Sequence, residues 1–455
     1  MSDVLLSYYG DDFTGSTDVM EALARAGLPT ALFLAPPSPA QLRRFPGLRA
    51  FGIAGTSRSM SPREMGRALP PVFRALRESG APLVHYKTCS TFDSSPGVGS
   101  IGRAIDLGQA VFHSPIVPLL VGAPVLGRYC LFGNLFARSG LDSEPARLDR
   151  HPTMRRHPTT PMDEADLRAH LAKQTRKRIG LFDVLKLEAP DYRERFVKER
   201  DEIVLLDVLN EGHLPRLGEL IAGRSSRRQP LFCAGSSGIE YALTAHWQAA
   251  GGIPAPPPTP PLGAARQLVC VSGSCSPVTA RQIAWAERNG FTAIALDTAA
   301  LIRARTARSA IATATAGAAP QLRAGRNVLF HTALGPDDAR LASTRAALKA
   351  ARKRSAEALS TALGRLLRAA LDHAPEARAA VTGGDTSAYV ARALGIEALE
   401  FAAPVAPGSP LCRVHSAGAA VHGREIVFKG GQVGHDDFFG TLLHGSTSKP
   451  RNKHP

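Results

Sequence analysis

The feature that most constrains this chain is a local pattern that recurs along it. A short apolar run is followed by a loop rich in Gly, Ser or Asp and then by residues at helical spacing, as in 4–34, 229–247, 266–296 and 377–396. Strands that alternate with helices form parallel sheets, and ligands bind at the carboxyl ends of such strands. The sequence therefore predicts an α/β fold with two domains, parallel-type sheets flanked by helices, and an active site in the interdomain cleft.

A proline- and glycine-rich stretch, AAGGIPAPPPTPPLGAAR at 249–266, divides the chain. Such a segment forms neither a helix nor an inner strand and acts as a semi-rigid spacer. We predict a first domain over 1–248, a linker over 249–264 and a second domain over 265–445. Residues 446–455 are predicted to be a disordered tail.

Composition and length place limits on the protein class. A chain of 455 residues that is 44% hydrophobic is long enough for two normal cores. It contains no apolar run of about 18 residues, and its N-terminus, MSDVLLSYYG, lacks the features of a signal peptide. We therefore expect a cytoplasmic protein without a membrane partner. The cysteines show no C-x-x-C spacing, which favours reduced thiols over a zinc site.

The net charge of +16 is compatible with a nucleic-acid-binding protein. However, the basic excess is spread over Arg- and Ala-rich segments such as 339–369 and over the tail. Aromatic residues make up only 6% of the chain and do not alternate with basic residues as in surfaces that stack bases. This pattern favours a basic surface that attracts small anions, without a nucleic-acid partner.

Three glycine-containing loops in the second half follow apolar, strand-like runs: SGSCSP at 272–277, TGGDTS at 382–387 and KGGQVG at 429–434. Glycine lets the backbone approach a phosphate closely, and free N–H groups then bind its oxygens. The chain has no G-x-x-x-x-G-K-[ST] motif, which excludes a P-loop, and no G-x-G-x-x-G opening a helix. From the residues alone, two interpretations of these loops are equally supported: a nucleotide-binding site and ordinary glycine turns.

The first half contains polar groups at two predicted strand ends. Asp11 and Asp12 lie in GDDFTGS, which we interpret as a loop over 10–16, and Arg58 lies in AGTSRS. A carboxylate at a strand end can accept a hydroxyl proton or bind Mg²⁺, and arginine suits a carboxylate ligand. The structural alternatives are a helix cap for either aspartate and a surface ion pair for the arginine.

The loop YKTCSTFDSSP, residues 86–96, places Lys87 beside several short hydroxyl and carboxylate side chains, among them Ser90 and Asp93. Such a group of donors and acceptors around one positive charge suits a small polyhydroxylated anion. The alternative is a solvated lysine in a polar loop. We predict a sugar-acid pocket at this loop.

In their order along the chain, DDFTGSTD, KTCSTFDSSP, HPTTPMDEADL, VSGSCSP, GGDTS and KGGQVG resemble the four-carbon acid sugar kinase family. The resemblance implies an N-terminal domain that binds an acid sugar and a C-terminal domain that binds ATP. It implies phosphorylation of a terminal hydroxyl of a 3-oxo-tetronate, threonate or erythronate, or 3-oxo-isoapionate type of substrate. At one point the chain departs from the family pattern: after CSTFDS it has SPGVGSIG in place of an Asn-Ile-Gly turn. In this segment the chain looks like a subgroup that acts on other oxidised acid sugars, such as 3-oxo-isoapionate.

The resemblance also implies site residues. ATP contacts correspond to Ser274, Gly383, Gly384, Asp385, Thr386 and Gly431, and substrate contacts correspond to Asp11, Asp12, Arg58, Lys87 and Ser90.

These residues lead to a mechanistic hypothesis. Arg58 and Lys87 hold the substrate carboxylate, and Asp12 accepts the hydroxyl proton, with Asp93 as the alternative base. Mg²⁺ bridges the ATP phosphates, although the sequence identifies no metal ligands. Two other classes stay open: a sugar-acid or nucleotide binding protein without turnover, and a nucleic-acid-binding protein. The sequence is compatible with a homodimer.

Overall fold

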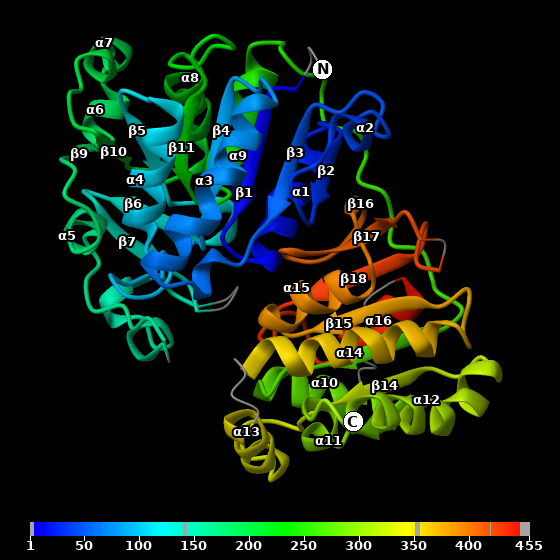
Figure 1. The fold of residues 1–455 in the computed structure, drawn as a ribbon. Coiled ribbons are helices and arrows are strands. Elements are labelled where there is room, and N and C mark those ends of the chain that lie inside the picture. Colours follow the sequence, from blue (N-terminus) through cyan, green and yellow to red (C-terminus); the bar gives the residue numbers. More distant parts are fainter. Residues whose placement is uncertain (1–3, 140–142, 158, 351–354, 419, 446–455) are drawn as a thin grey trace, which may run out of the picture. The chain divides into compact units, whose positions relative to one another are not determined.

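The computed structural model describes residues 4–139, 143–157, 159–350, 355–418 and 420–445. The chain divides into two compact units, Met1–Pro257 and Pro258–Pro455. Each unit contains a mostly parallel sheet flanked by helices (Figure 1), which confirms the predicted α/β fold class. The predicted tail at 446–455 lies outside the described residues.

The first unit contains a parallel sheet with the strand order β2-β3-β1-β4-β11-β5-β10-β9. Its strands are β1 Leu6–Gly10, β2 Thr30–Phe33, β3 Ala50–Ala54, β4 Leu83–Lys87, β5 Val117–Leu120, β9 Ile179–Phe182, β10 Ile203–Leu206 and β11 Leu231–Gly235. A small antiparallel sheet consists of β6 Arg128–Leu131, β7 Asn134–Ala137 and β8 Ala146–Arg147. The helices are α1 Phe13–Arg25, α2 Pro39–Leu42, α3 Pro62–Glu78, α4 Ile101–Phe112, α5 Leu167–Ala172, α6 Val184–Glu188, α7 Tyr192–Val197, α8 Leu214–Ala222 and α9 Gly238–Ala249. Short 3₁₀ helices are η1 Ser57–Ser59, η2 Pro124–Leu126, η3 Leu148–Arg150, η4 Met154–Arg156 and η5 Glu211–His213.

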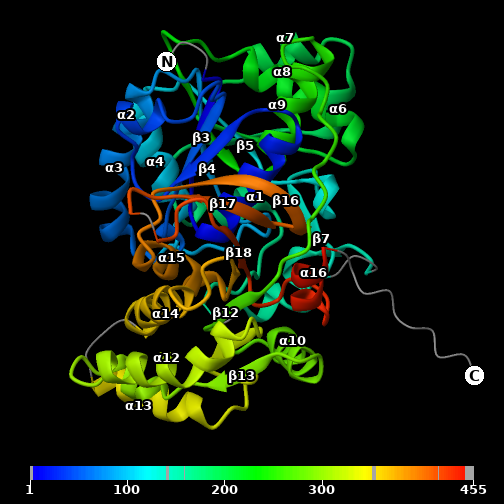
Figure 2. The ribbon, with the colours of Figure 1, turned by 90° about the vertical axis from the view of Figure 1, so that its right-hand side faces the viewer.

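The direction of the crossovers explains why helices cover both faces of this sheet. The connection through α1 runs from β1 past β3 to β2, whereas the connection through α3 runs the opposite way, from β3 past β1 to β4. Because such connections are right-handed, the two helices lie on opposite faces. Accordingly, α3 packs with α4 on one face, and α1 packs with α9 on the other (Figures 1 and 2).

The first helix begins earlier than the sequence pattern predicted. We expected a loop over 10–16, but α1 starts at Phe13, because the Asp12 side chain accepts a hydrogen bond from Gly15 N at 2.8 Å. This N-cap satisfies one of the free N–H groups in the first helical turn. Of the apolar residues at helical spacing in this stretch, Val19, Met20 and Leu23 are buried and Ala24 is partly buried, so the helical pattern predicted after the loop is present.

The second unit contains a sheet with the strand order β13-β14-β12-β15-β18-β17-β16, in which β17 is antiparallel to both of its neighbours. Its strands are β12 Leu268–Ser272, β13 Thr292–Ala295, β14 Val328–His331, β15 Arg378–Thr382, β16 Ala398–Ala406, β17 Ser409–His415 and β18 Glu425–Lys429. The helices are α10 Pro277–Arg288, α11 Thr298–Ile302, α12 Ala307–Arg323, α13 Arg340–Ala350, α14 Ser355–Leu371, α15 Gly384–Ala393 and α16 Phe438–His444. Ser276 caps α10 and Pro277 is its first residue.

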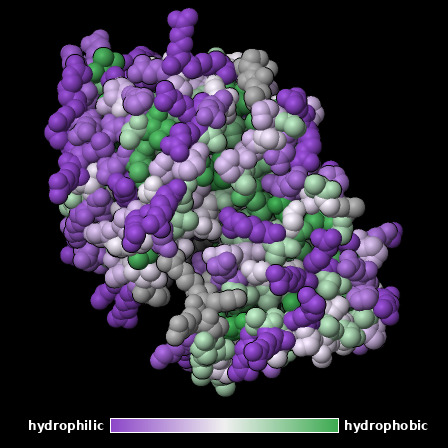
Figure 3. All heavy atoms as spheres, in the orientation of Figure 1, coloured by the Kyte–Doolittle hydropathy of each residue, from purple (hydrophilic) through white to green (hydrophobic). Residues whose placement is uncertain are grey.

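The described surface gives no indication of a membrane-spanning segment. No helix in the described ranges combines the length and the apolar character needed to cross a bilayer. On the face shown in Figure 3, hydrophilic side chains cover much of the surface of both units, with smaller hydrophobic groups between them.

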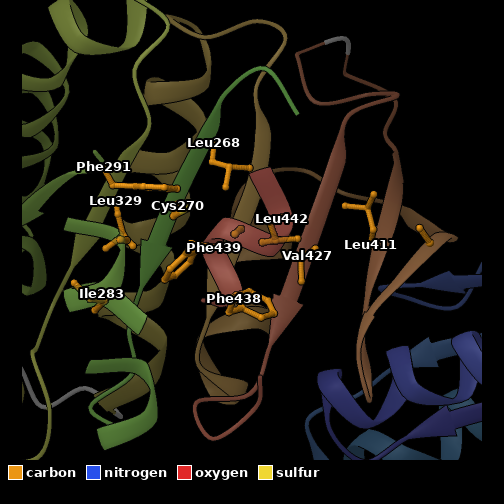
Figure 4. Close-up of a cluster of buried hydrophobic side chains, with 13 residues drawn as sticks. Leu268, Cys270, Ile283, Phe291, Leu329, Leu411, Val427, Phe438, Phe439 and Leu442 are labelled. Carbon is orange, nitrogen blue, oxygen red and sulfur yellow. The ribbon is translucent and has the colours of Figure 1, made fainter. Parts of the chain in front are cut away.

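The face of the second sheet that packs against α10 and α16 carries an apolar cluster (Figure 4). Leu268 and Cys270 on β12, Val427 on β18, and Phe438 and Phe439 on α16 belong to it. Alternate residues of a strand point to the same face. Ser272 and Lys429, the last residues of β12 and β18, follow Cys270 and Val427 by two positions and therefore point to the same face as the cluster.

Candidate active site

Three neighbouring strands of the first unit bring the predicted substrate residues to one edge of the sheet. Gly10 at the end of β1 pairs in register with Ala54 on β3 and with Lys87 on β4. The backbone of Asp11 then joins the two flanking segments: its N–H donates to the Lys87 carbonyl at 2.9 Å, and its carbonyl accepts from Arg58 N–H at 3.0 Å. The sequence prediction that these residues lie together is consistent with this geometry.

Arg58 joins two of the predicted carboxylates. Its Nη1 lies 3.0 Å from Asp12 Oδ2, and its Nη2 donates to Asp93 Oδ2. Asp93 also accepts a hydrogen bond from Thr91 Oγ1 at 2.7 Å. Burial by itself raises the pKa of Asp93, but Arg58 and Thr91 outweigh it, so that the pKa is lowered from its ordinary value. Asp12 and Asp93 are thus held in place, and Asp93 is kept ionised.

Lys87 is buried, not solvated: only 3% of the residue is exposed. Its Nζ donates to the Thr88 carbonyl at 2.9 Å and lies 3.7 Å from Asp18 Oδ2 on α1. Burial opposes its charge, but Asp18, Cys89 and the two strand-end aspartates together raise the pKa of Lys87. The ammonium group therefore stays charged inside the unit.

Asp11 differs from the other aspartates of this edge. It is buried, and its Oδ1 has no hydrogen-bond partner among the described residues. Burial, followed by the charge of Asp12, raises the pKa of Asp11 to about 7. A carboxyl group with a pKa near neutral pH and an unpaired oxygen is suited to accept a proton from a bound hydroxyl group.

The loop after β4 is fixed by an unusual backbone conformation and by one side chain from α5 and one just after it. Phe92 is buried and has a φ of 54°, a conformation that costs a non-glycine residue about 1–3 kcal/mol. The next hydroxyl, Ser94 Oγ, lies 3.0 Å from His170 Nε2 and accepts from Gln174 Nε2 at 2.9 Å. Ser90, by contrast, is only partly buried. These contacts fix the segment that carries Asp93.

The predicted nucleotide residues of the second unit also come together. Thr279 Oγ1 donates to the Gly431 carbonyl at 2.8 Å, and a Cβ atom on Gly431 would lie 2.5 Å from Ser274 Oγ. A Cβ atom on Gly383, which has a φ of 120°, would lie 2.8 Å from Thr386 Oγ1 in the same loop and 3.5 Å from the carbonyl carbon of Gly273 in the loop at 272–277. The three loops therefore approach one another so closely that side chains at these two glycines would collide with them.

Helix α15 begins without a side-chain cap. Its N-cap is Gly383, whose N–H donates to the Lys429 carbonyl at 2.9 Å. The first helical N–H groups, of Gly384, Asp385 and Thr386, have no partner within the described part of the chain, and the Asp385 side chain is exposed. Free N–H groups at a helix start, together with the helix dipole, form a binding site for anions such as phosphate.

Two charged residues of these edges were missed by the sequence reasoning. Asp18 pairs with Lys87 from the second turn of α1, and Lys429 is a buried lysine at the end of β18. Asp18 is the last residue of the motif DDFTGSTD, in which only the first two aspartates were selected. Lys429 is the first residue of KGGQVG, where only a glycine was selected. Among the described residues there is no cluster of three or more His, Cys, Asp or Glu side chains arranged to bind a metal.

Comparisons with known proteins cover both units. A family model described as a sugar-binding N-terminal domain matches residues 6–243, and one described as a nucleotide-binding C-terminal domain matches residues 269–439. The 3-oxo-isoapionate kinase of Paraburkholderia graminis is 47% identical over 448 residues, which are 97% of this chain and 94% of the relative. The 3-oxo-tetronate kinase of Pectobacterium atrosepticum is 30% identical over 459 residues, which are 96% of this chain and 98% of the relative.

Solved structures give the same result for the fold. A protein of Salmonella typhimurium LT2 has a TM-score of 0.75 at 25% identity, and the match covers 95% of this chain and 97% of that protein. A Haemophilus influenzae protein has a TM-score of 0.68 at 22% identity, with 96% and 100% covered. From the two family models and the nearly full-length relatives, we conclude that this chain belongs to the family with a sugar-binding N-terminal and a nucleotide-binding C-terminal domain, the four-carbon acid sugar kinase family that its motifs resemble.

Proposed function

We propose that this protein is an ATP-dependent kinase that phosphorylates a terminal hydroxyl group of an acid sugar of the 3-oxo-isoapionate type. The observation that carries the proposal is the 47% identity to a 3-oxo-isoapionate kinase over nearly the full length of both chains. The 3-oxo-tetronate kinases that match are about equally long but only 29–30% identical. The departure of this chain at SPGVGSIG supports the same choice of substrate.

In this proposal the first unit binds the acid sugar at the ends of β1, β3 and β4. Arg58 has five N–H donors, of which Asp12 and Asp93 occupy two, and 31% of its side chain is exposed. Its remaining donors bind the substrate carboxylate. Lys87 is buried and supplies a second positive charge close to Asp11 and Asp12.

We place the general base at Asp11. The sequence hypothesis assigned this role to Asp12, with Asp93 as the alternative, but Asp12 caps α1 and both of these carboxylates bind Arg58. Asp11 has an oxygen without a hydrogen-bond partner in the described ranges and a pKa of about 7. When the terminal hydroxyl attacks the γ-phosphorus of ATP, Asp11 takes the hydroxyl proton, a phosphorus–oxygen bond forms, and the bond to ADP breaks.

The second unit binds ATP in this proposal. The free N–H groups at the start of α15 and the loops that carry Ser274 and Gly431 accommodate the phosphates. Mg²⁺ is usually bound by one or two carboxylates together with substrate phosphates, and the exposed Asp385 at the start of α15 fits this requirement. Bound there, the ion would neutralise phosphate charge during transfer.

ADP formation from ATP tests this proposal directly. The substrate panel contains 3-oxo-isoapionate, 3-oxo-tetronates, threonate and erythronate, and the neutral parent sugars serve as controls. We expect ADP release that depends on an oxidised acid sugar, with the highest kcat/KM for 3-oxo-isoapionate. Saturable binding of the acid sugar without ADP release would identify a binding protein instead. Binding to nucleic acid that weakens steeply with salt would favour the nucleic-acid alternative.

A further inference from the structure

The last residues of three adjacent strands in the second unit form a row of buried polar side chains. Ser272 on β12 pairs in register with Thr382 on β15, and Thr382 pairs in register with Lys429 on β18. Residues that pair in register in a parallel sheet point to the same face. This row therefore continues, at the carboxyl edge, the face that carries the apolar cluster of Figure 4.

Among the described residues, two members of this row lack a hydrogen-bond partner and the third lacks a counter-charge, which is unusual for buried polar groups. Ser272 Oγ and Thr382 Oγ1 are buried and have no hydrogen-bond partner within the described ranges. Lys429 has no exposed surface. Its Nζ donates to the carbonyl of the next residue, Gly430, at 3.0 Å and lies 5.3 Å from the centre of the Phe438 ring. In the described part of the chain, no carboxylate lies within ion-pairing distance of this ammonium group.

A second buried cation on the same face shows that such a charge can be neutralised by the fold. Arg378 lies four residues before Thr382 on β15, and Glu425 lies four residues before Lys429 on β18. Arg378 Nε and Nη2 lie 2.9 and 2.6 Å from Glu425 Oε2. The amino end of this face therefore has a complete ion pair, whereas the carboxyl end has a lysine without a counter-charge. Burial of an unpaired charge is strongly unfavourable unless an external anion binds it.

Lys429 also lies where the three glycine-containing loops meet. Its carbonyl accepts from Gly383 N–H, directly before the uncapped start of α15. Gly431, two residues after Lys429, lies close to the Ser274 side chain. We propose that Lys429 binds a phosphate oxygen of the nucleotide and that this anion supplies the counter-charge of the row. The inference deepens the proposed function and rests on its placement of ATP in the second unit. On binding, Nζ exchanges the Gly430 carbonyl for the phosphate oxygen, and the glycines of 430–434 permit the necessary movement.

The proposal predicts that the protonation state of Lys429 changes when the nucleotide binds. Burial lowers the pKa of Lys429 to about 7 in the free protein. The titratable groups on the segments around it are Asp385 on α15 and His435, Asp436 and Asp437 before α16; Asp436 pairs with Arg281 at 3.0 Å. Burial is the sole cause of the shift, so none of these groups contributes to it. A bound phosphate favours the ammonium form and raises this pKa, so nucleotide binding at pH 8 takes up a proton.

Calorimetry of the full chain with a non-hydrolysable ATP analogue tests this consequence. Binding is measured at pH 8 and pH 6, each in two buffers that differ in ionisation enthalpy, so that the number of protons taken up is obtained. We expect an uptake approaching one proton at pH 8, where the phosphates of the analogue are already ionised, and a much smaller uptake by Lys429 at pH 6. This part of the test needs no variant.

Lys429→Met removes the charge and keeps the length of the side chain. We expect it to weaken binding of the analogue about 10- to 100-fold, the loss of one charge-assisted hydrogen bond, and to abolish the proton uptake at pH 8. At pH 6, where the free lysine is charged, the substitution removes an unpaired buried charge, so the melting temperature of the free protein should not fall there. The matched control is Lys173→Met, which removes a half-exposed lysine from the first unit and should change neither the affinity for the analogue nor the proton uptake.

The outcomes separate the two proposals. If the wild-type chain does not bind the analogue, the placement of ATP in the proposed function is wrong. If the wild-type chain binds but takes up no proton at pH 8, or if Lys429→Met binds with unchanged affinity, Lys429 does not contact the phosphate and this inference is overturned.

Discussion

At the scale of single residues, three aspartates of the first unit have the same side chain and different chemistry. Asp12 and Asp93 are bound by Arg58, and the pKa of Asp93 is lowered despite its burial. Asp11 is buried without such a partner, and its pKa is raised to about 7. The surroundings, not the residue type, determine which carboxylate can act as the base.

The pH dependence of catalysis tests the assignment of Asp11. Because a base must be deprotonated, we expect wild-type kcat/KM to fall about tenfold per pH unit below pH 7. Asp11→Asn should lower kcat at pH 8 by about 100-fold or more, and its residual activity should lack this limb of the profile. Steady-state ADP formation between pH 5.5 and 9 is the measurement. An Asp11→Asn variant with the wild-type profile would transfer the role to another group.

The same substitution should stabilise the protein at high pH. The folded state keeps the Asp11 proton up to about pH 7, whereas an unfolded aspartate loses it near 3.8, so wild-type stability falls as the pH rises between these values. We expect Asp11→Asn to raise the melting temperature at pH 8 and to change it little at pH 4. Asp93→Asn is the matched control: its wild-type pKa is lowered, so loss of this charge should reduce stability at pH 8.

A second prediction at this scale concerns Lys87 and Asp18. Lys87→Met removes the cation that faces Asp18 and should both lower the melting temperature and reduce kcat/KM for the acid sugar about 10- to 100-fold. The double variant Lys87→Met/Asp18→Asn removes both charges and should recover the melting temperature without recovering kcat/KM. Recovery of both quantities would show that Lys87 serves stability alone.

At the scale of secondary-structure elements, the two units differ in how a helix begins after a strand. The start of α1 is capped by the Asp12 side chain, which satisfies Gly15 N–H within the protein. The start of α15 follows Gly383 and has no side-chain cap. A capped helix start has less capacity for an anion, whereas an uncapped start keeps its N–H groups for a phosphate. This contrast supports the placement of ATP at α15.

Substitution at the first residue of α15 tests that placement. Gly384→Val puts a branched side chain beside the free N–H groups, and we expect it to raise KM for ATP at least about tenfold while KM for the acid sugar stays near wild type. Gly317→Val on α12 is the matched control, because no neighbouring atom lies within 4 Å of a Cβ atom there. Equal effects of the two substitutions would attribute the change to helix stability and not to phosphate binding.

At the scale of the whole molecule, each ligand should protect one unit. Hydrogen exchange of the intact chain is measured with an ATP analogue or with the acid sugar alone. We expect the analogue to slow exchange in the loops at 272–277, 382–387 and 429–434, and the acid sugar to slow exchange at 86–96, because bound ligands stabilise the segments that they contact. Protection of 10–16 by the nucleotide alone would reverse the assignment of the two units.

The sequence by itself determined the local elements and their class. Glycine, serine and aspartate after apolar runs predicted strand ends, because turn preferences act over a few residues. The start of α10 likewise depends on two neighbouring residues, the cap Ser276 and the first helical residue Pro277. The boundary of α1 was wrong, since the capping hydrogen bond of Asp12 competes with a loop at the same residues.

Only the tertiary structure decided which charges meet. Arg58 binds a carboxylate 35 positions later in the chain, and Lys87 faces a carboxylate on α1, so neither pair follows from local spacing. Strand order and register placed Ser272, Thr382 and Lys429 in one row, where the lysine has no counter-charge among the residues that the structure describes. The physical reason is that pKa values and ion pairs depend on burial and distance, which the chain acquires only when strands far apart in sequence become neighbours.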